Sequence, residues 1–202
     1  MERFLETGRL VLRAFGPDDV DRVLSLDGDP DVMRHINGGR PVSREEIARD
    51  TLPALLRSFP CLDGAHGEGR GHWAAQDRAS GDFLGWFEFR PTAPDSAEEV
   101  ELGYRLHRRA WGRGLATEGS RALIRRGFAE LGVLRVTATT MTVNSRSRRV
   151  MEKSGLVHVR TFFEEWPETI EGSEHGDVEY AVSREDWLRG AAAAGRGAPT
   201  GP

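Results

Sequence analysis

The chain has 202 residues, of which 38% are hydrophobic and 30% are charged, and its formal net charge is −4. This length suits one domain with a sizeable core, and the composition is typical of a globular protein rather than a disordered one. No apolar run approaches the ~20 residues that a membrane span needs. Residues 1–12 lack the apolar core of a signal peptide. The single cysteine, Cys61, excludes a disulfide framework and a zinc cluster, so a cytoplasmic protein fits best.

Charge is distributed unevenly along the chain. Seven arginines and one acid, Glu118, lie between Arg105 and Arg126, whereas seven acids and no lysine or arginine lie between Thr161 and Glu179. Each residue could be an ordinary solvated surface charge. As clusters, they indicate one region suited to anions and another suited to cations. The overall acidic balance argues against nucleic-acid binding.

The first half of the chain alternates between strand and helix patterns. A strand is predicted over 9–15, and Pro17 with its following acids opens a helix that ends near Leu26. Glycine and proline break the chain at 28–30 and 38–41. Ser43 and Glu46 form the signature of a capping box, which begins a second helix that Pro53 could kink. The strands at 72–76 and 83–90 are joined by a turn at 79–82.

The second half carries the more regular pattern. Strands are predicted at 99–106, 134–143, 156–163 and 178–182, and helices at 114–131 and 145–154. The long helix has a face of apolar or small residues: Ala116, Ser120, Leu123, Ile124, Gly127, Phe128 and Leu131. This order predicts a mixed α+β fold, a largely antiparallel sheet of about seven strands flanked by helices. Residues 1–189 are expected to form one domain, and residues 190–202 a flexible tail.

The segment from Leu106 to Thr117 joins a strand to the long helix through a turn that holds Gly112 and Gly114. The free backbone amides of a helix start, with the helix dipole behind them, make a site for an anion. Glycine permits the turn and lets phosphate oxygens approach the backbone closely. Arg109 and Arg113 add positive charge, so the segment predicts a pyrophosphate site.

Two other phosphate motifs do not match this turn. There is no Gly-Lys-Ser/Thr, which excludes a Walker loop. A dinucleotide fingerprint would need a third glycine three residues after Gly114 and an early strand-helix-strand context, and the chain has neither.

Several segments resemble the GNAT superfamily of N-acetyltransferases. Arg109–Gly114 matches the family's (Gln/Arg)-x-x-Gly-x-(Gly/Ala) motif. Glu101–Tyr104, Leu115–Glu118, Val143–Leu156 and the opening at residues 6–13 look like the RimJ/RimL branch, which acetylates ribosomal-protein N-termini. The resemblance covers roughly residues 6–187, and it implies a GNAT fold in which a splayed strand pair holds coenzyme A.

The resemblance also implies roles for individual residues. The pyrophosphate would lie on the amides of the turn, the pantetheine arm would run beside the strand that ends at Leu106, and Asn144 would bond that arm. Ser147 would lie near the thioester sulfur. Asn144 could equally be a helix N-cap, and Ser147 an ordinary first-turn serine. The predicted cofactor-binding set is Leu106, Arg109, Trp111, Gly112, Arg113, Gly114, Leu115, Ala116, Thr117, Asn144 and Ser147.

One position departs from the family pattern. Many members carry a tyrosine in the second helix that protonates the departing thiolate, and the matching residue here is Met151. The acid would then be Ser147 or a water. A coenzyme A thiol is acidic enough to leave as a thiolate, so the enzyme could also work without one.

The attacking amine must lose a proton, because lysine and N-terminal amines have pKa values of about 10.4 and 8. A carboxylate can accept that proton. Glu101, in the strand that precedes the turn, is the leading candidate for the base, although it could be a surface acid. Glu164 and Glu165 are the alternative. His35 is expected in a loop on the acceptor side and is left outside the catalytic set.

The resemblance leaves the acceptor open. An acetyltransferase for protein N-termini is the first hypothesis, and acetylation of an aminoglycoside, a polyamine or an amino acid is the second. A third hypothesis, a non-catalytic acyl-CoA sensor, is favoured by Met151 and opposed by Glu101 and Ser147. The oligomeric state is also open, although dimers are common in the branch.

Overall fold

The computed structural model describes residues 3–56, 70–93, 98–164 and 169–196, and its centre is one mixed sheet. The strand order is β1-β2-β3-β4-β5-β6-β8-β7. All neighbours pair antiparallel except β5 and β6, which are parallel and joined by a helix. The strands are β1 (Arg3–Glu6), β2 (Leu10–Ala14), β3 (Gly71–Asp77), β4 (Phe83–Pro91), β5 (Glu99–Leu106), β6 (Arg135–Met141), β7 (Val157–Phe162) and β8 (Asp177–Ser183).

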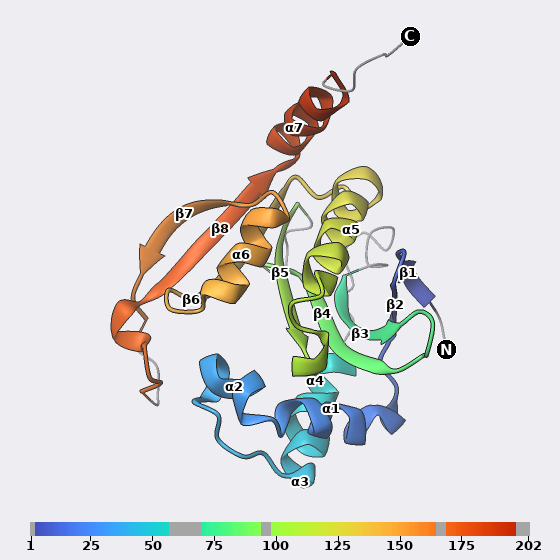
Figure 1. The fold of residues 1–202 in the computed structure, drawn as a ribbon, viewed down its shortest axis with the longest axis vertical. Coiled ribbons are helices and arrows are strands. Elements are labelled where there is room, and N and C mark those ends of the chain that lie inside the picture. Colours follow the sequence, from blue (N-terminus) through green and yellow to red (C-terminus); the bar gives the residue numbers. More distant parts are fainter. Residues whose placement is uncertain (1–2, 57–69, 94–97, 165–168, 197–202) are drawn as a thin grey trace.

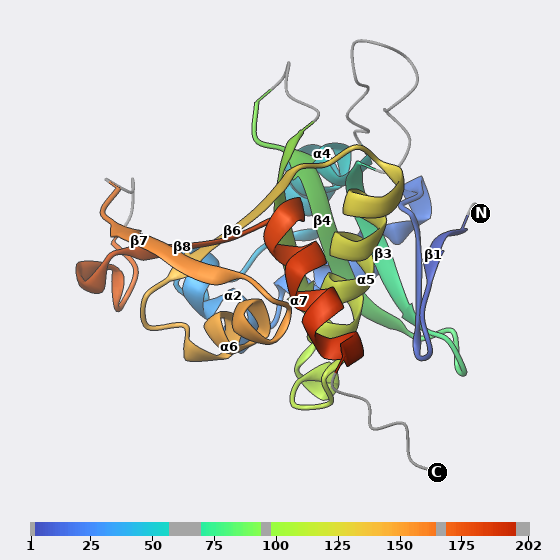
Figure 2. The same cartoon turned by 90° about the horizontal axis from the view of Figure 1, so that it is seen from above.

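Helices cover both faces of the sheet (Figures 1 and 2). Helices α5 and α6 pack on one face, and α1 to α4 pack on the other. Within the described ranges, no helix is both long and apolar enough to cross a membrane. The helices are α1 (Val20–Asp27), α2 (Pro30–Asn37), α3 (Arg44–Glu46), α4 (Leu52–Leu56), α5 (Leu115–Glu130), α6 (Ser145–Lys153) and α7 (Arg184–Arg196), with 3₁₀ turns η1 (Pro17–Asp19), η3 (Arg108–Ala110) and η4 (Ser173–His175) and a π-helical turn η2 (Ile47–Thr51).

The prediction for the N-terminal region is wrong at two places. It omits β1, and it takes residues 28–30 as a break, whereas a helix begins there. The side chain of Asp29 accepts a hydrogen bond from the amide of Asp31 at 3.0 Å, and Pro30 occupies the first helical position. An acid followed by proline can begin a new helix, as N-cap and first helical residue, as well as end the preceding one. His35 therefore lies in α2, at its kink, and not in a loop.

The other elements agree closely with the predicted ranges. Ser43 caps α3 as expected, because its hydroxyl accepts from the amide of Glu46 at 3.1 Å. At the C-terminus, α7 runs to Arg196 and so enters the segment 190–202 for which the sequence predicts a flexible tail. Four consecutive alanines, residues 191–194, have the highest helix propensity and explain the difference. Residues 197–202 lie outside the described ranges, and the domain boundary itself stays a prediction.

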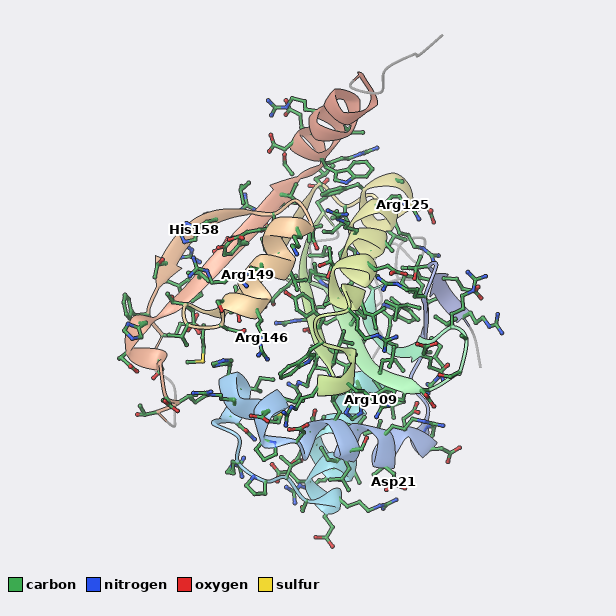
Figure 3. The ribbon with its side chains drawn as sticks, viewed as in Figure 1. Asp21, Arg109, Arg125, Arg146, Arg149 and His158 are labelled. Carbon is green, nitrogen blue, oxygen red and sulfur yellow. The ribbon has the colours of Figure 1, made fainter. Side chains whose placement is uncertain are left out.

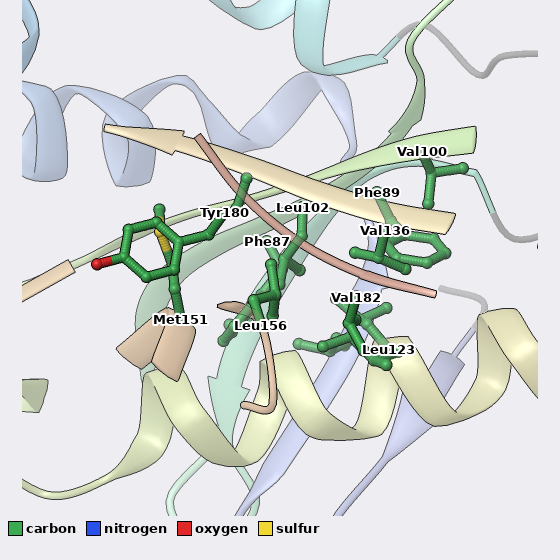
Figure 4. Packing of buried hydrophobic residues seen from close by; sticks show 14 of the residues in the cluster. Phe87, Phe89, Val100, Leu102, Leu123, Val136, Met151, Leu156, Tyr180 and Val182 are labelled. Atoms are coloured by element: carbon green, nitrogen blue, oxygen red, sulfur yellow. The ribbon is translucent and has the colours of Figure 1, made fainter. Parts of the chain in front are cut away.

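The larger core lies between α5 and the sheet (Figure 4). Phe87 and Phe89 of β4 are fully buried there. Two glycines of α5 make room for their rings: a Cβ at Gly119 would lie 2.3 Å from Phe87 Cζ, and one at Gly127 would lie 2.7 Å from Phe89 Cζ. The helix consequently sits close on β4. Gly127 belongs to the predicted apolar face, but Gly119 does not.

The second core lies on the opposite face and joins α1, α2 and α4 to β3 and β4. Its edge holds a buried ion pair. Arg13 of β2 donates two hydrogen bonds, of 2.7 and 2.8 Å, to the carboxylate of Asp19 at the start of α1. Burial alone would raise the pKa of Asp19, but the hydrogen bonds from Arg13, from the Gly16 amide and from Arg22 lower it to about 2. This carboxylate is therefore charged, and it fixes α1 against the sheet.

We expect Gly119→Ala to lower the free energy of unfolding by about 1–3 kcal/mol, because the added methyl group overpacks against the Phe87 ring. Gly190→Ala is the matched control in a helix, since a Cβ there meets nothing within 4 Å. That variant should be neutral or slightly more stable. Urea denaturation measures both, and equal stabilities of the two variants would refute the close contact between α5 and β4.

Candidate active site

Strands β5 and β6 pair along only part of their length. The paired residues are Glu99 with Arg135, Val100 with Val136 and Glu101 with Thr137. Beyond them β5 continues to Leu106 beside β4, whereas β6 continues to Met141 beside β8. The two strands thus form a fork that opens just after Glu101. The structure has the splayed pair that the sequence predicts, and the backbone of β5 beyond Glu101 faces the opening.

The predicted anion site lies at the open end of this fork. Gly112 and Gly114 have φ values of 70° and 75°, which other residues rarely adopt. The first hydrogen bond of α5 runs from the amide of Glu118 to the carbonyl of Gly114, at 3.0 Å. The amides of residues 114–117 precede it and have no partner within the helix. A Cβ at Gly112 would meet nothing within 4 Å, so the turn is open to a phosphate.

The N-terminal hairpin holds this turn in place. Glu118 accepts hydrogen bonds from the Thr7 hydroxyl at 2.6 Å and from the Arg9 amide at 2.9 Å. Burial opposes the charge on Glu118, but the hydrogen bonds from Thr7 and Arg9 lower its pKa overall. Arg9 also donates to the carbonyl of Arg113 at 2.8 Å. Thr7 and Arg9 are supporting residues that the site prediction does not include, although both belong to the family-like opening segment.

The arginines near the turn have different partners. Arg109 donates to the carbonyl of Phe83 at 2.5 Å and so contacts β4. Arg113 lies 3.8 Å from Asp77. Arg146, at the start of α6, stacks over the ring of Trp111 at 5.0 Å, and Figure 3 labels it together with Arg109. Because Arg109 is engaged by β4, the amides of the turn and the dipole of α5 carry more of the anion site than the sequence indicates.

Trp111 and α6 form the other side of the fork. The indole of Trp111 donates to the carbonyl of Leu106 at 2.7 Å. Asn144 caps α6, accepting from the amide of Ser147 at 3.2 Å, and its own amide donates to Thr140 at 3.1 Å. Asn144 is therefore an N-cap, which leaves its predicted bond to the pantetheine arm a proposal.

Ser147 has a neighbour that the sequence does not indicate. The hydroxyl of Tyr104, from β5, lies 3.0 Å from both the Oγ and the carbonyl oxygen of Ser147. Burial raises the pKa of Tyr104, although the hydrogen bond with Ser147 opposes the shift. The phenol therefore keeps its proton at neutral pH. Met151 is buried in the core, so its position offers no acid, as the sequence predicts.

Glu101 lies on the opposite face of β5, in a network of charged groups. Its Oε2 accepts from Arg90 at 2.5 Å, and its Oε1 accepts from the Thr139 hydroxyl at 2.9 Å. Arg90 also forms an ion pair with Glu88 at 2.5 Å, and Glu88 lies 3.2 Å from Nε2 of His72. The structure thus brings a second carboxylate, Glu88, to the candidate base. A lone acid between Phe87 and Phe89 is the sequence signal that could have identified it.

Some of the acids between Thr161 and Glu179 form ion pairs with arginines and are therefore not free to attract a cationic acceptor. Glu171 lies 3.5 Å from Arg34 of α2, and Glu179 forms ion pairs with Arg135 and Arg160. Glu164 is exposed, whereas Glu165 lies outside the described residues. Nearby, burial and the charge of Arg34 lower the pKa of His35, although Glu171 opposes them.

Several known proteins are similar to this chain in sequence or in fold. The family model described as "Acetyltransferase (GNAT) domain" matches residues 9–157. The FsC-acetyl coenzyme A-N(2)-transacetylase of Aspergillus fumigatus is 37% identical over 193 residues, 92% of this chain and 78% of that protein. Spermidine N-acetyltransferase from Vibrio cholerae, solved with CoA and spermine, has a TM-score of 0.70 at 16% identity and covers 90% of this chain and 99% of that one. RimL, a ribosomal L7/L12 alpha-N-protein acetyltransferase solved with coenzyme A, has a TM-score of 0.70 at 18% identity, covering 90% and 98%.

The chain belongs to the GNAT family of acetyltransferases. It is an acetyl-CoA-dependent N-acetyltransferase with a mixed α+β GNAT fold, and the hypothesis of a non-catalytic sensor is not supported. The similarity to RimL is limited to the fold, so the RimJ/RimL branch stays a prediction.

Gly114→Val should abolish the binding of acetyl-CoA in calorimetry. A branched side chain disfavours φ of 75° and stands where phosphate must approach the amides. Gly132→Val is the matched control, because Gly132 follows the other end of α5 with φ of 69°; a Cβ there would meet nothing within 4 Å, and one at Gly114 would meet only the end of the Arg9 side chain, at 3.7 Å. Folded Gly114→Val protein with wild-type affinity would show that the pyrophosphate binds elsewhere.

Proposed function

We propose that this enzyme acetylates a primary amine of a small molecule by direct attack within a ternary complex. The main support for this reaction is the fork between β5 and β6. The candidate anion site lies at its open end, and two carboxylates, Glu88 and Glu101, lie on the face of the sheet opposite Tyr104. The acceptor class rests on the relative at 37% identity, whose name states transfer to an N(2) nitrogen. The similarity to RimL is at 18%, so a protein N-terminus becomes the second candidate.

The residues present fit acetyl coenzyme A. We infer that the amides of residues 114–117 hold its pyrophosphate and that the open edge of β5 up to Leu106 holds the pantetheine arm. Acetyl coenzyme A supplies an activated acyl group when bound. Arg146 and Trp111 would close one side of the arm, and Asn144 stands at the other strand of the fork.

A hydrogen-bond donor would stabilise the departing sulfur, and Ser147 together with Tyr104 can supply one. The phenol stays protonated, so it can donate to Ser147 and leave the serine hydroxyl free to donate toward the sulfur. Many family members carry a tyrosine in the helix that corresponds to α6, at the position where this chain has Met151. Tyr104, which lies on β5, would take over the role of that tyrosine. Ser147 is the donor in this proposal and Tyr104 is a positioning residue.

Tyr104→Phe should lower kcat roughly tenfold or more and leave acetyl-CoA affinity within about twofold, because only the departing thiolate loses stabilisation. Tyr180→Phe is the matched control: the Tyr180 hydroxyl also bonds to α6, but to the side chains of Arg148 and Glu152. Steady-state kinetics and calorimetry measure both effects. If neither Tyr104→Phe nor Ser147→Ala lowers kcat, this pair of residues does not donate a hydrogen bond to the departing sulfur.

The acceptor class is tested by acetyl-CoA turnover against matched amines: small molecules with an α-amine, polyamines, aminoglycosides, N-terminal peptides and lysine peptides. We expect at least one small amine to exceed every peptide in kcat/KM by about 10²-fold or more. Product masses identify the acetylated nitrogen. A preference for N-terminal peptides would instead place the enzyme with RimL, and turnover of no amine despite tight acetyl-CoA binding would refute the proposal.

Two further features remain proposals. Val157 and Val159 of the edge strand β7 are exposed, at 67% and 46%, as is Phe163 beyond it, and a homodimer would cover this apolar edge.

We also retain the cytoplasmic location that the sequence composition favours.

A further inference from the structure

Glu88 and Glu101, the two carboxylates on the face of β4 and β5 opposite Tyr104, are not equivalent. Both oxygens of Glu101 accept hydrogen bonds, from Arg90 and from Thr139. Glu88 is bound differently: its contacts with His72 and Arg90 are made through Oε1. Within the described part of the chain, no hydrogen bond reaches Oε2 of Glu88. This oxygen is therefore open to an incoming donor, whereas each oxygen of Glu101 already accepts one hydrogen bond.

Oε2 of Glu88 is also the atom of this side chain that lies closest to the space above Gly103 of β5. Glu88 is paired with Gly103 across β4 and β5. A Cβ at Gly103 would lie 2.7 Å from Oε2 and 3.2 Å from the Cβ of Glu88. Gly103 lies two residues beyond Glu101, the last residue of β5 that pairs with β6, and therefore on the same face. The carboxylate thus occupies the space over the first same-face position after the strands separate.

We propose that Glu88 accepts the proton of the attacking amine, and that Glu101 and Arg90 are positioning residues that hold it. The inference deepens the proposed function and rests on it. The nitrogen lone pair forms the bond to the acetyl carbon, the carbon–sulfur bond breaks with its electron pair on sulfur, and the nitrogen's proton passes to Oε2 of Glu88. The thiolate leaves with a hydrogen bond from the Ser147 hydroxyl and takes its proton from solvent.

Other charged groups face this carboxylate and must be considered in any pH dependence. His72 contacts it from β3 and Arg90 from β4, while Glu101 stands beyond Arg90 on β5. Further along the same face, Arg105 forms an ion pair with Asp27 of α1 at 2.7 Å. Arg90 contacts the carboxylates of both Glu88 and Glu101, at 2.5 Å each, and so holds the two side by side.

Glu88→Gln and Glu101→Gln form the central comparison. With the best amine from the acceptor panel, Glu88→Gln should lower kcat at pH 7 by about 10²-fold or more, since general-base catalysis contributes that much. The deficit should shrink at least tenfold by pH 9.5, where more of the amine is unprotonated. It should also shrink at pH 7 for an acceptor amine of lower pKa. Glu101→Gln should cost less than about tenfold and show no such dependence.

Gly103→Ala is a second variant that leaves every ionisable group in place. The added methyl group displaces the Glu88 carboxylate, which is the flexible end of its side chain, so the fold should survive. We expect a loss of kcat with the same recovery at high pH, and wild-type affinity for acetyl-CoA in calorimetry.

The results separate this inference from the proposed function. Turnover of an amine by the wild type together with full activity of Glu88→Gln would overturn the role of Glu88 alone. A deficit of Glu88→Gln that stays constant from pH 7 to 9.5 would also overturn it, because a merely structural carboxylate predicts that result. A larger, pH-dependent loss in Glu101→Gln would return the role to Glu101. Absence of wild-type turnover with every amine would instead refute the proposed function.

Discussion

The short pairing between β5 and β6 is the constraint on which the rest of the site depends. Only three residue pairs join the strands, and the pairing ends at Glu101 and Thr137. A parallel pair that continued would satisfy the edge of β5 with β6 and leave no backbone for a ligand. Because β6 instead follows β8, the edge of β5 stays available next to the start of α5. The candidate anion cradle, Tyr104 and Glu88 all lie on or beside the part of β5 that follows Glu101, where β5 and β6 have separated.

Interactions far apart in the chain fix both sides of the fork. Gly119 lets α5 rest on Phe87, which sets the height of the helix start above β4. Glu118 ties the same helix start to Thr7 and Arg9 of the N-terminal hairpin. On the other side, Asn144 fixes the first turn of α6. The helix that presents amides and the helix that presents Ser147 are thus held separately, and β5 connects them through Tyr104.

Local patterns in the sequence predicted much of this architecture. The alternation at 99–106 and the glycines of the turn led to β5, to α5 and to the positive-φ turn between them, because each depends on neighbouring residues only. The network around Glu101 could not be predicted in this way, since Glu88 and Arg90 come from β4 and Thr139 from β6, and the register of these strands with β5 is set by the whole sheet. Asp29-Pro30 was misread because the same residues can end one helix and begin another. Gly119 was missed because a glycine that admits a ring from another element has no periodic signature.

The buried pair of Arg13 and Asp19 has a consequence for acid tolerance. The pKa of Asp19 falls from its ordinary 3.8 to about 2 in the folded protein. A lowered carboxyl pKa adds stability that is complete above the unfolded value and is lost only as the pH falls from about 4 toward 2. The attachment of α1 to the sheet through this pair is therefore independent of pH across the neutral and alkaline range. Changes in rate measured there report on groups at the fork and not on the loosening of this clamp.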